Sequence, residues 1–248
     1  MSLLIMPLLT TPLLKVPLSI TRALCVQIAT TPPNPPPLQS EMKKFGAQPD
    51  TLSKRSGAWK TATGMRFVLW CTTLCETAVI VAEMFPSTVS DKVLSLLPHP
   101  PSAAALCVSP VFFAGWLFTC TGALIRMSCF RTLGRLFTWE LAVRDNHRLV
   151  TTGPYSIVRH PSYTGSTLVG IGNLLCAFGP GSYWVESGFL RSPVGRVLGT
   201  AWLVYWIFIP ALLWSRVNKE DAVLKKEFGK EWEAWAKKTP YKLLPFVY

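Results

Sequence analysis

Long runs without any charged residue constrain this chain more than any other feature. Three of them cover residues 100–125, 161–185 and 197–214, with 26, 25 and 18 residues. About 20 predominantly apolar residues cross the hydrocarbon core of a bilayer as one helix, so each run predicts a membrane span. Charged residues make up only 15% of the chain, against about 25% in soluble domains. The sequence therefore predicts an all-α integral membrane protein.

Two further apolar segments add to the predicted membrane part. Residues 67–82 form a span with Glu76 near its middle. A carboxylate at that depth faces the bundle interior or a watery cavity, and we favour a structural hydrogen bond over a catalytic role. Residues 1–31 are apolar but contain three prolines. They are open to three interpretations: a first membrane helix, which we favour, a cleaved signal or a presequence. About five transmembrane helices result.

The chain divides into three consecutive parts. Residues 1–64 hold the N-terminal apolar segment and a Pro-rich linker, residues 65–137 hold the second and third spans, and residues 138–248 hold two spans and a tail. Residues 219–239 are predicted to form one amphipathic helix that Pro240 ends. Its apolar stripe consists of Leu224, Phe228, Trp232 and Trp235.

The net charge of +12 fits a membrane surface better than nucleic acid. The run 100–125 is followed by five arginines, Arg126, Arg131, Arg135, Arg144 and Arg148. They place that end of the span, and with it the tail, in the cytoplasm, where anionic lipid attracts basic residues. No basic block is interleaved with stacking aromatics, which argues against a nucleic-acid partner. The seven cysteines form no CxxC pair and only three histidines are present, so no metal site is predicted.

One polar stretch, residues 149–165, directly precedes and opens an apolar run. It gathers Tyr155, Arg159, His160 and Tyr163 around two prolines and two glycines. Pro161 suits the first turn of a helix, and the free amides there would favour a carboxylate-bearing ligand. We interpret the stretch as one wall of a site, with the C-terminal tail as the other wall. The alternative is a set of interfacial anchors.

A second polar group follows the last apolar run. Arg216 and Glu220 are four residues apart and share one helix face, with Asp221 beside them. They form either an ordinary surface ion pair or a site in which Arg216 grips an anion through its planar fork. In that site Glu220 accepts from hydroxyls or offsets a cation. No GxSxG, HExxH or Walker loop is present, so a reaction here would need positioning more than proton transfer.

Together these motifs resemble the isoprenylcysteine carboxyl methyltransferase family over residues 138–248. The resemblance implies transfer of a methyl group from S-adenosylmethionine to the C-terminal carboxylate of prenylated cysteine in CaaX-processed proteins. It also implies a multi-pass protein of the endoplasmic reticulum membrane whose active site faces the cytoplasm, in contact with membrane lipid. The matching segments are residues 147–150, 152–155, 159–163, Gly165, 216–221 and 228–232.

The resemblance also implies roles for individual residues. Arg216 would hold the substrate carboxylate and, with Glu220, form the catalytic pair. Where the family usually has two glutamates, this chain has Glu220 and Asp221, and the assignment of the acid stays open between them. S-adenosylmethionine would be held by Glu140, His147, Arg148, Leu149, Val150, Tyr155, His160, Pro161, Ser162, Tyr163 and Glu220.

Three alternatives stay open. The chain end also resembles the tail of membrane sterol reductases, which use NADPH. Phospholipid methyltransferases would keep S-adenosylmethionine and change the acceptor. A non-enzymatic membrane scaffold would tolerate replacement of Arg216, Glu220 and His160 without loss of any ligand.

Overall fold

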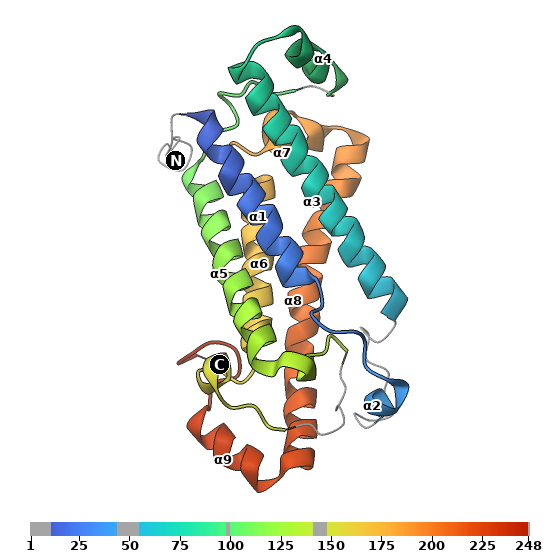
Figure 1. Cartoon of the computed structure of the whole chain (residues 1–248), viewed down its shortest axis with the longest axis vertical. Helices are drawn as coiled ribbons and strands as arrows, with labels where there is room; N and C mark the ends of the chain where they lie inside the picture. Colours follow the sequence, from blue (N-terminus) through green and yellow to red (C-terminus); the bar gives the residue numbers. More distant parts are fainter. Residues whose placement is uncertain (1–10, 44–54, 98–99, 141–147, 248) are drawn as a thin grey trace. The chain divides into compact units, whose positions relative to one another are not determined.

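The computed structural model describes residues 11–43, 55–97, 100–140 and 148–247. Five helices in this part are long and apolar enough to cross a membrane, which confirms the predicted all-α integral membrane fold (Figure 1). They are α1 (Lys15–Thr30), α3 (Arg55–Met84), α5 (Pro110–Leu133), α6 (Pro161–Phe178) and α8 (Pro193–Phe228). The shorter helices are η2 (Pro12–Leu14), α2 (Gln39–Lys43), α4 (Thr88–Leu96), η3 (Gly134–Leu136), η4 (Gly153–Ser156), α7 (Tyr183–Glu186), η5 (Phe189–Arg191) and α9 (Lys230–Lys238).

Prolines and a serine set where three of the long helices begin. Pro17 lies in the first turn of α1, where a missing amide costs no helical hydrogen bond. Helix α5 begins at Pro110, where the Ser109 hydroxyl accepts from the Phe112 amide at 3.1 Å and caps the helix. Pro161 begins α6, as predicted.

The prediction of one tail helix over 219–239 is wrong. The last span continues to Phe228 as part of α8, and α9 is a separate helix that ends at Lys238. Between them Gly229 has φ 51° and ψ −120°, a conformation that glycine adopts without the steric cost of a Cβ. The prediction from the apolar stripe therefore missed the helix break at Gly229.

The chain forms two compact units, and all five long helices contribute residues to both. Unit 1 comprises Met1–Gln27, Gly64–Thr121 and Leu168–Phe208, and unit 2 comprises Ile28–Thr63, Gly122–Thr167 and Ile209–Tyr248. The three-part division along the sequence stays a prediction.

Unit 1 is held together by close packing and one buried ion pair. A Cβ on Gly172 of α6 would overlap Gly115 and Thr119 of α5, so these helices approach closely, as small residues permit. Lys15 Nζ of α1 lies 2.6 Å from Glu76 Oε1 of α3. The expectation of a structural role for Glu76 is thereby confirmed, and α1 packs against α3 as a helix of the bundle.

Unit 2 has a small apolar core at the start of the polar stretch. Cys129, Tyr155 and Trp235 form its buried centre, and the Trp235 indole donates to the Tyr155 carbonyl at 3.1 Å. Helix α9 is thus attached to the turn that precedes α6.

The Pro-rich linker is fixed through Asn34, whose amide donates to the carbonyls of Gly134 in η3 and of Phe137, the residue after η3, at 2.7 and 3.0 Å.

Candidate active site

The polar stretch and the end of the chain are joined by backbone hydrogen bonds within unit 2. The amides of Arg159 and His160 donate to the carbonyls of Tyr241 and Lys242 at 3.0 and 2.8 Å. The Arg159 guanidinium also donates to two carbonyls just before Tyr241, those of residues 239 and 240, each at 3.0 Å. The predicted contact between this stretch and the tail is therefore confirmed.

Two carboxylates of α8 meet the same stretch. Asp221 bridges two residues, since its Oδ2 lies 3.2 Å from Arg159 Nη2 and its Oδ1 lies 3.0 Å from His160 Nε2. Glu220 Oε2 lies 3.4 Å from His160 Nδ1 and accepts from the Tyr163 hydroxyl at 2.7 Å. Residues about 60 positions apart in the sequence thus form one hydrogen-bonded cluster, which we call the ion cluster.

His160 is the centre of the ion cluster. It is buried, and its ring stacks on Tyr163 with 5.5 Å between the centroids. Burial lowers the pKa of the imidazole, but hydrogen bonds to Asp221 and Glu220 and their negative charges outweigh this effect and raise the pKa to about 9. His160 is therefore a cation at neutral pH and donates through both ring nitrogens.

Arg216 lies one helical turn before Glu220 on α8, as its spacing predicts. Its side chain is 4% exposed, and Nη2 donates to the Trp139 carbonyl at 3.1 Å. The Glu220 side chain is 29% exposed, so its carboxylate is the acidic group of the ion cluster that a ligand reaches most readily. The interpretation of Arg216 and Glu220 as an exposed surface pair does not fit this burial.

The other residues to which the resemblance gives a cofactor role are spread around the ion cluster and the core of unit 2. Leu149 and Val150 pack against the apolar core around Tyr155, and Arg148 is exposed. Burial raises the pKa of the Tyr155 hydroxyl well above its usual value, so this group stays neutral. Glu140 is buried directly after Trp139. His147 lies outside the described residues.

Pro161 and Ser162 are buried at the start of α6, and Ser162 has a partner that the sequence analysis did not assign to the site. Arg126 Nη1 of α5 donates to the Ser162 carbonyl at 3.2 Å and to its hydroxyl at 3.0 Å, and Nε donates to the Ala29 carbonyl at 2.6 Å. In the sequence, Arg126 is one of the five arginines that follow residues 100–125 and indicates only the orientation of that span. The glycine at position 165 indicates from the sequence that another helix approaches α6 closely here. In the structure a Cβ on Gly165 would meet the Gly122 carbonyl of α5.

Asp221 is the second residue whose importance the sequence left open. Both of its oxygens are used inside the ion cluster, by Arg159 and His160. Glu220 instead binds Tyr163 and presents part of its carboxylate to solvent. The two acids therefore occupy different positions: Asp221 holds the ion cluster together, and Glu220 is the one placed to meet a ligand.

The comparisons with known proteins agree with the motifs. The model of the isoprenylcysteine carboxyl methyltransferase family matches residues 115–185, a region that ends before Arg216. A probable protein-S-isoprenylcysteine O-methyltransferase of Oryza sativa subsp. indica is 30% identical over 139 residues, which is 55% of this chain and 62% of the relative. The Schizosaccharomyces pombe protein-S-isoprenylcysteine O-methyltransferase is 30% identical over 151 residues, 60% of this chain and 56% of the relative.

A weaker match leads to another class of protein. A Delta(14)-sterol reductase of Candida albicans is 24% identical over 109 residues, which is 44% of this chain and 20% of the reductase. The chain covers less than two thirds of each of these relatives. The resemblance drawn from the motifs is nevertheless confirmed: the chain is similar to the isoprenylcysteine carboxyl methyltransferase family, whose model matches it across α6 and most of α5.

Proposed function

We propose that this protein transfers a methyl group from S-adenosylmethionine to the C-terminal carboxylate of a prenylated cysteine. The observation that carries the proposal is the ion cluster. It joins the Arg159–Tyr163 motif of α6 and its preceding turn to Glu220 and Asp221 of α8. Arg216 is buried one turn away on the same helix. These are the two motifs on which the family resemblance rests.

The donor set of the ion cluster fits S-adenosylmethionine. The partly exposed Glu220 carboxylate accepts from hydroxyl or ammonium groups, both of which this molecule carries. Arg159 Nε of the ion cluster has no hydrogen-bond partner among the described residues and suits the carboxylate of S-adenosylmethionine. Outside the ion cluster, the indole N–H of Trp139, whose carbonyl binds Arg216, is likewise without a partner in the described part of the chain. When bound, the sulfonium group supplies an activated methyl group. The residues proposed to hold it remain those that the resemblance names, with Tyr163 and Glu220 in direct mutual contact.

Arg216 is proposed to hold the substrate carboxylate. A guanidinium presents its donors in a planar fork that matches a carboxylate, and the bond to the Trp139 carbonyl fixes its orientation. The carboxylate is already ionised at neutral pH, so the chain has to align it and needs no base to activate it. Burial of Arg216 strengthens its attraction for the substrate carboxylate, so the proposed role of Arg216 is to bind and align this group.

The membrane setting belongs to the same proposal. The arginines that follow residues 100–125 favour the cytoplasmic face for the C-terminal end of α5, the end from which Arg126 reaches Ser162. The prenyl chain of the substrate would lie in lipid while its peptide stays in the cytoplasm. Residence in the endoplasmic reticulum and prenylated, CaaX-processed proteins as partners follow from the family resemblance alone.

The experiment uses membranes that contain the full chain, methyl-labelled S-adenosylmethionine and a small S-farnesylcysteine acceptor. We expect base-labile label in the acceptor, strongly reduced in Arg216→Ala and partly kept in Arg216→Lys, which retains the charge but loses the fork. Lys219→Ala removes an exposed cation from the same helix and should leave the rate unchanged.

Two outcomes would overturn the proposal. Label in phospholipid with none in the farnesylcysteine would make the protein a phospholipid methyltransferase. Sterol-dependent oxidation of NADPH without methyl transfer would make it a reductase, the class to which the Candida albicans relative belongs.

A further inference from the structure

Unit 1 buries charged groups that the proposed reaction does not use. Lys15 is fully buried and Glu76 is 4% exposed, in helices that span the membrane. Lys15 Nζ binds Glu76 Oε1 at 2.6 Å and the Gly181 carbonyl at 2.5 Å, and the Ser19 hydroxyl donates to Glu76 Oε2 at 2.7 Å. Both oxygens of the one carboxylate are thus engaged by these two donors.

A second buried cation lies beside this pair. Arg22 is 4% exposed, and its charge acts on Glu76 while its side chain contacts the Cys176 thiol. A thiol is only a weak acceptor. Arg22 Nε has no hydrogen-bond partner among the described residues. Lys15 and Arg22 together carry two positive charges, and Glu76 carries one negative charge. One positive charge is therefore left uncompensated, and a buried charge without a partner is costly.

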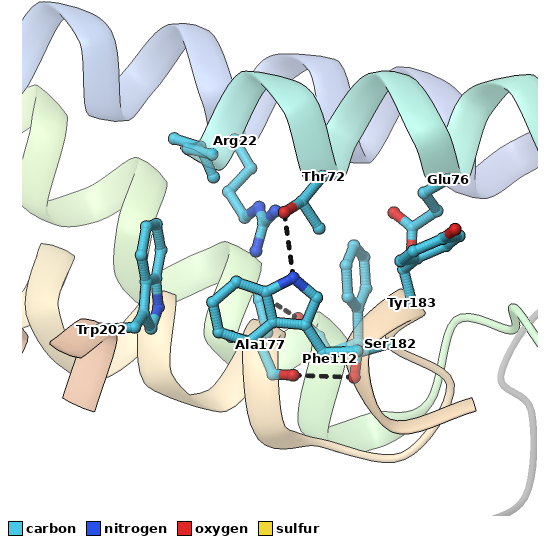
Figure 2. Close-up of a pocket in the computed structure, with 11 residues that line it drawn as sticks. Arg22, Thr72, Glu76, Phe112, Ala177, Ser182, Tyr183 and Trp202 are labelled. Atoms are coloured by element: carbon cyan, nitrogen blue, oxygen red, sulfur yellow. Dashed lines mark hydrogen bonds between the residues drawn. The ribbon is translucent and has the colours of Figure 1, made fainter. Parts of the chain in front are cut away.

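Arg22 lines a cavity of ≈ 10 Å³, and Figure 2 shows the side chains around it. Trp202 also lines it, is 2% exposed, and has an indole N–H without a hydrogen-bond partner in the described part of the chain. Trp184, a third lining residue, donates to the Thr72 hydroxyl at 3.0 Å and is satisfied. The residues that line the cavity therefore have two unused hydrogen-bond donors, Arg22 Nε and Trp202 Nε1. A ligand that accepts hydrogen bonds and donates none would match them.

Size and charge restrict the ligand further. A volume of ≈ 10 Å³ has room for about one water-sized particle, which excludes a lipid headgroup. Glu186 does not supply the missing charge, because it is exposed and accepts from the Gly181 amide at 2.8 Å. A water molecule would satisfy hydrogen bonds but would leave the positive charge uncompensated.

We propose that this cavity binds one small monovalent anion of halide size, held by Arg22 and Trp202 inside unit 1. The anion balances the charges of Lys15, Arg22 and Glu76 and accepts from both unused donors. The site lies apart in sequence from every residue of the ion cluster and is independent of the proposed methyl transfer. It makes the stability of the bundle depend on the halide concentration.

The test measures thermal unfolding of the purified full chain in detergent at constant ionic strength, with sodium gluconate replaced stepwise by sodium bromide. An anion that binds only the folded chain raises the melting temperature in a saturable way. We expect this rise in the unmodified chain and in Arg196→Gln, which removes an exposed cation of α8. In Arg22→Gln the bromide affinity should fall at least tenfold.

A second variant keeps the charge and removes one donor. Trp202→Phe should fold even if Arg22→Gln does not, and its bromide affinity should fall about tenfold, as expected for loss of one hydrogen bond to a charged group. In crystals grown with bromide, anomalous density should lie between Arg22 and Trp202. Equal melting temperatures in gluconate and bromide, or bromide density elsewhere with water in the cavity, would overturn the proposal.

Discussion

Replacement of Asp221 by asparagine tests the ion cluster most directly. The carboxylate accepts from Arg159 Nη2 and His160 Nε2 at 3.2 and 3.0 Å. An asparagine side chain has one acceptor and one donor group in place of two acceptors, so it leaves either the guanidinium or the imidazolium facing a donor. Removal of one partner from a buried charge pair costs about 3 to 5 kcal/mol.

The raised pKa of His160 gives a second measure of the stability that the ion cluster contributes. A rise of the His160 pKa from 6.5 to about 9 corresponds to about 3 kcal/mol of stability. Because the folded-state pKa is the higher one, this contribution is complete below pH 6.5 and is lost as the pH rises through about 9. In Asp221→Asn the His160 pKa moves back toward 6.5, so the decrease in stability between pH 7 and pH 9 becomes smaller.

The assay is thermal unfolding of the full chain in detergent at several pH values between 6 and 9.5. At roughly 2 to 4 °C per kcal/mol for a chain of this size, Asp221→Asn should unfold about 10 °C lower at pH 6.5. Glu227→Gln removes an exposed carboxylate from the same helix and serves as the matched control. An equal shift in both variants, or a melting temperature of the unmodified chain that stays constant up to pH 9.5, would refute the reasoning.

Three further predictions concern other contacts. Tyr163→Phe removes the 2.7 Å hydrogen bond to the Glu220 carboxylate and should weaken binding of labelled S-adenosylmethionine about tenfold, measured by equilibrium dialysis. Gly172→Ala places a Cβ in the facing helix and should lower the melting temperature, whereas Gly64→Ala, which meets nothing within 4 Å, should not. Glu76→Gln should destabilise the bundle by about 3 to 5 kcal/mol, because Lys15 and Arg22 then lie buried without a carboxylate, and Lys15→Met should cost less, because Arg22 still faces Glu76.

The membrane fold was predictable because hydrophobic runs and helix length are local properties. Three uncharged runs and two apolar segments each correspond to a long helix, and Pro161 begins α6 as expected. The break at Gly229 was missed because periodicity averages over a turn, whereas a single glycine with φ 51° is enough to end a helix.

The site was predictable in its two motifs and not in its contacts. The spacing of Arg216 and Glu220 shows that they share a helix face, but nothing local shows that Asp221 faces Arg159 and His160. Such contacts depend on how α8 is placed against the turn before α6. The same holds for Arg126, whose partner Ser162 is 36 positions away in the sequence.

The ion cluster also bears on which acceptor the proposed methyl transfer would use. An amine acceptor must lose a proton to a base, but His160 donates through both nitrogens, and Asp221 is engaged by Arg159 and His160. Glu220 in turn accepts from Tyr163 and faces the His160 cation. A carboxylate acceptor needs no base, because it is ionised at neutral pH, and the buried guanidinium of Arg216 attracts it. The same groups thus favour a carboxylate over the amine headgroup of a phospholipid.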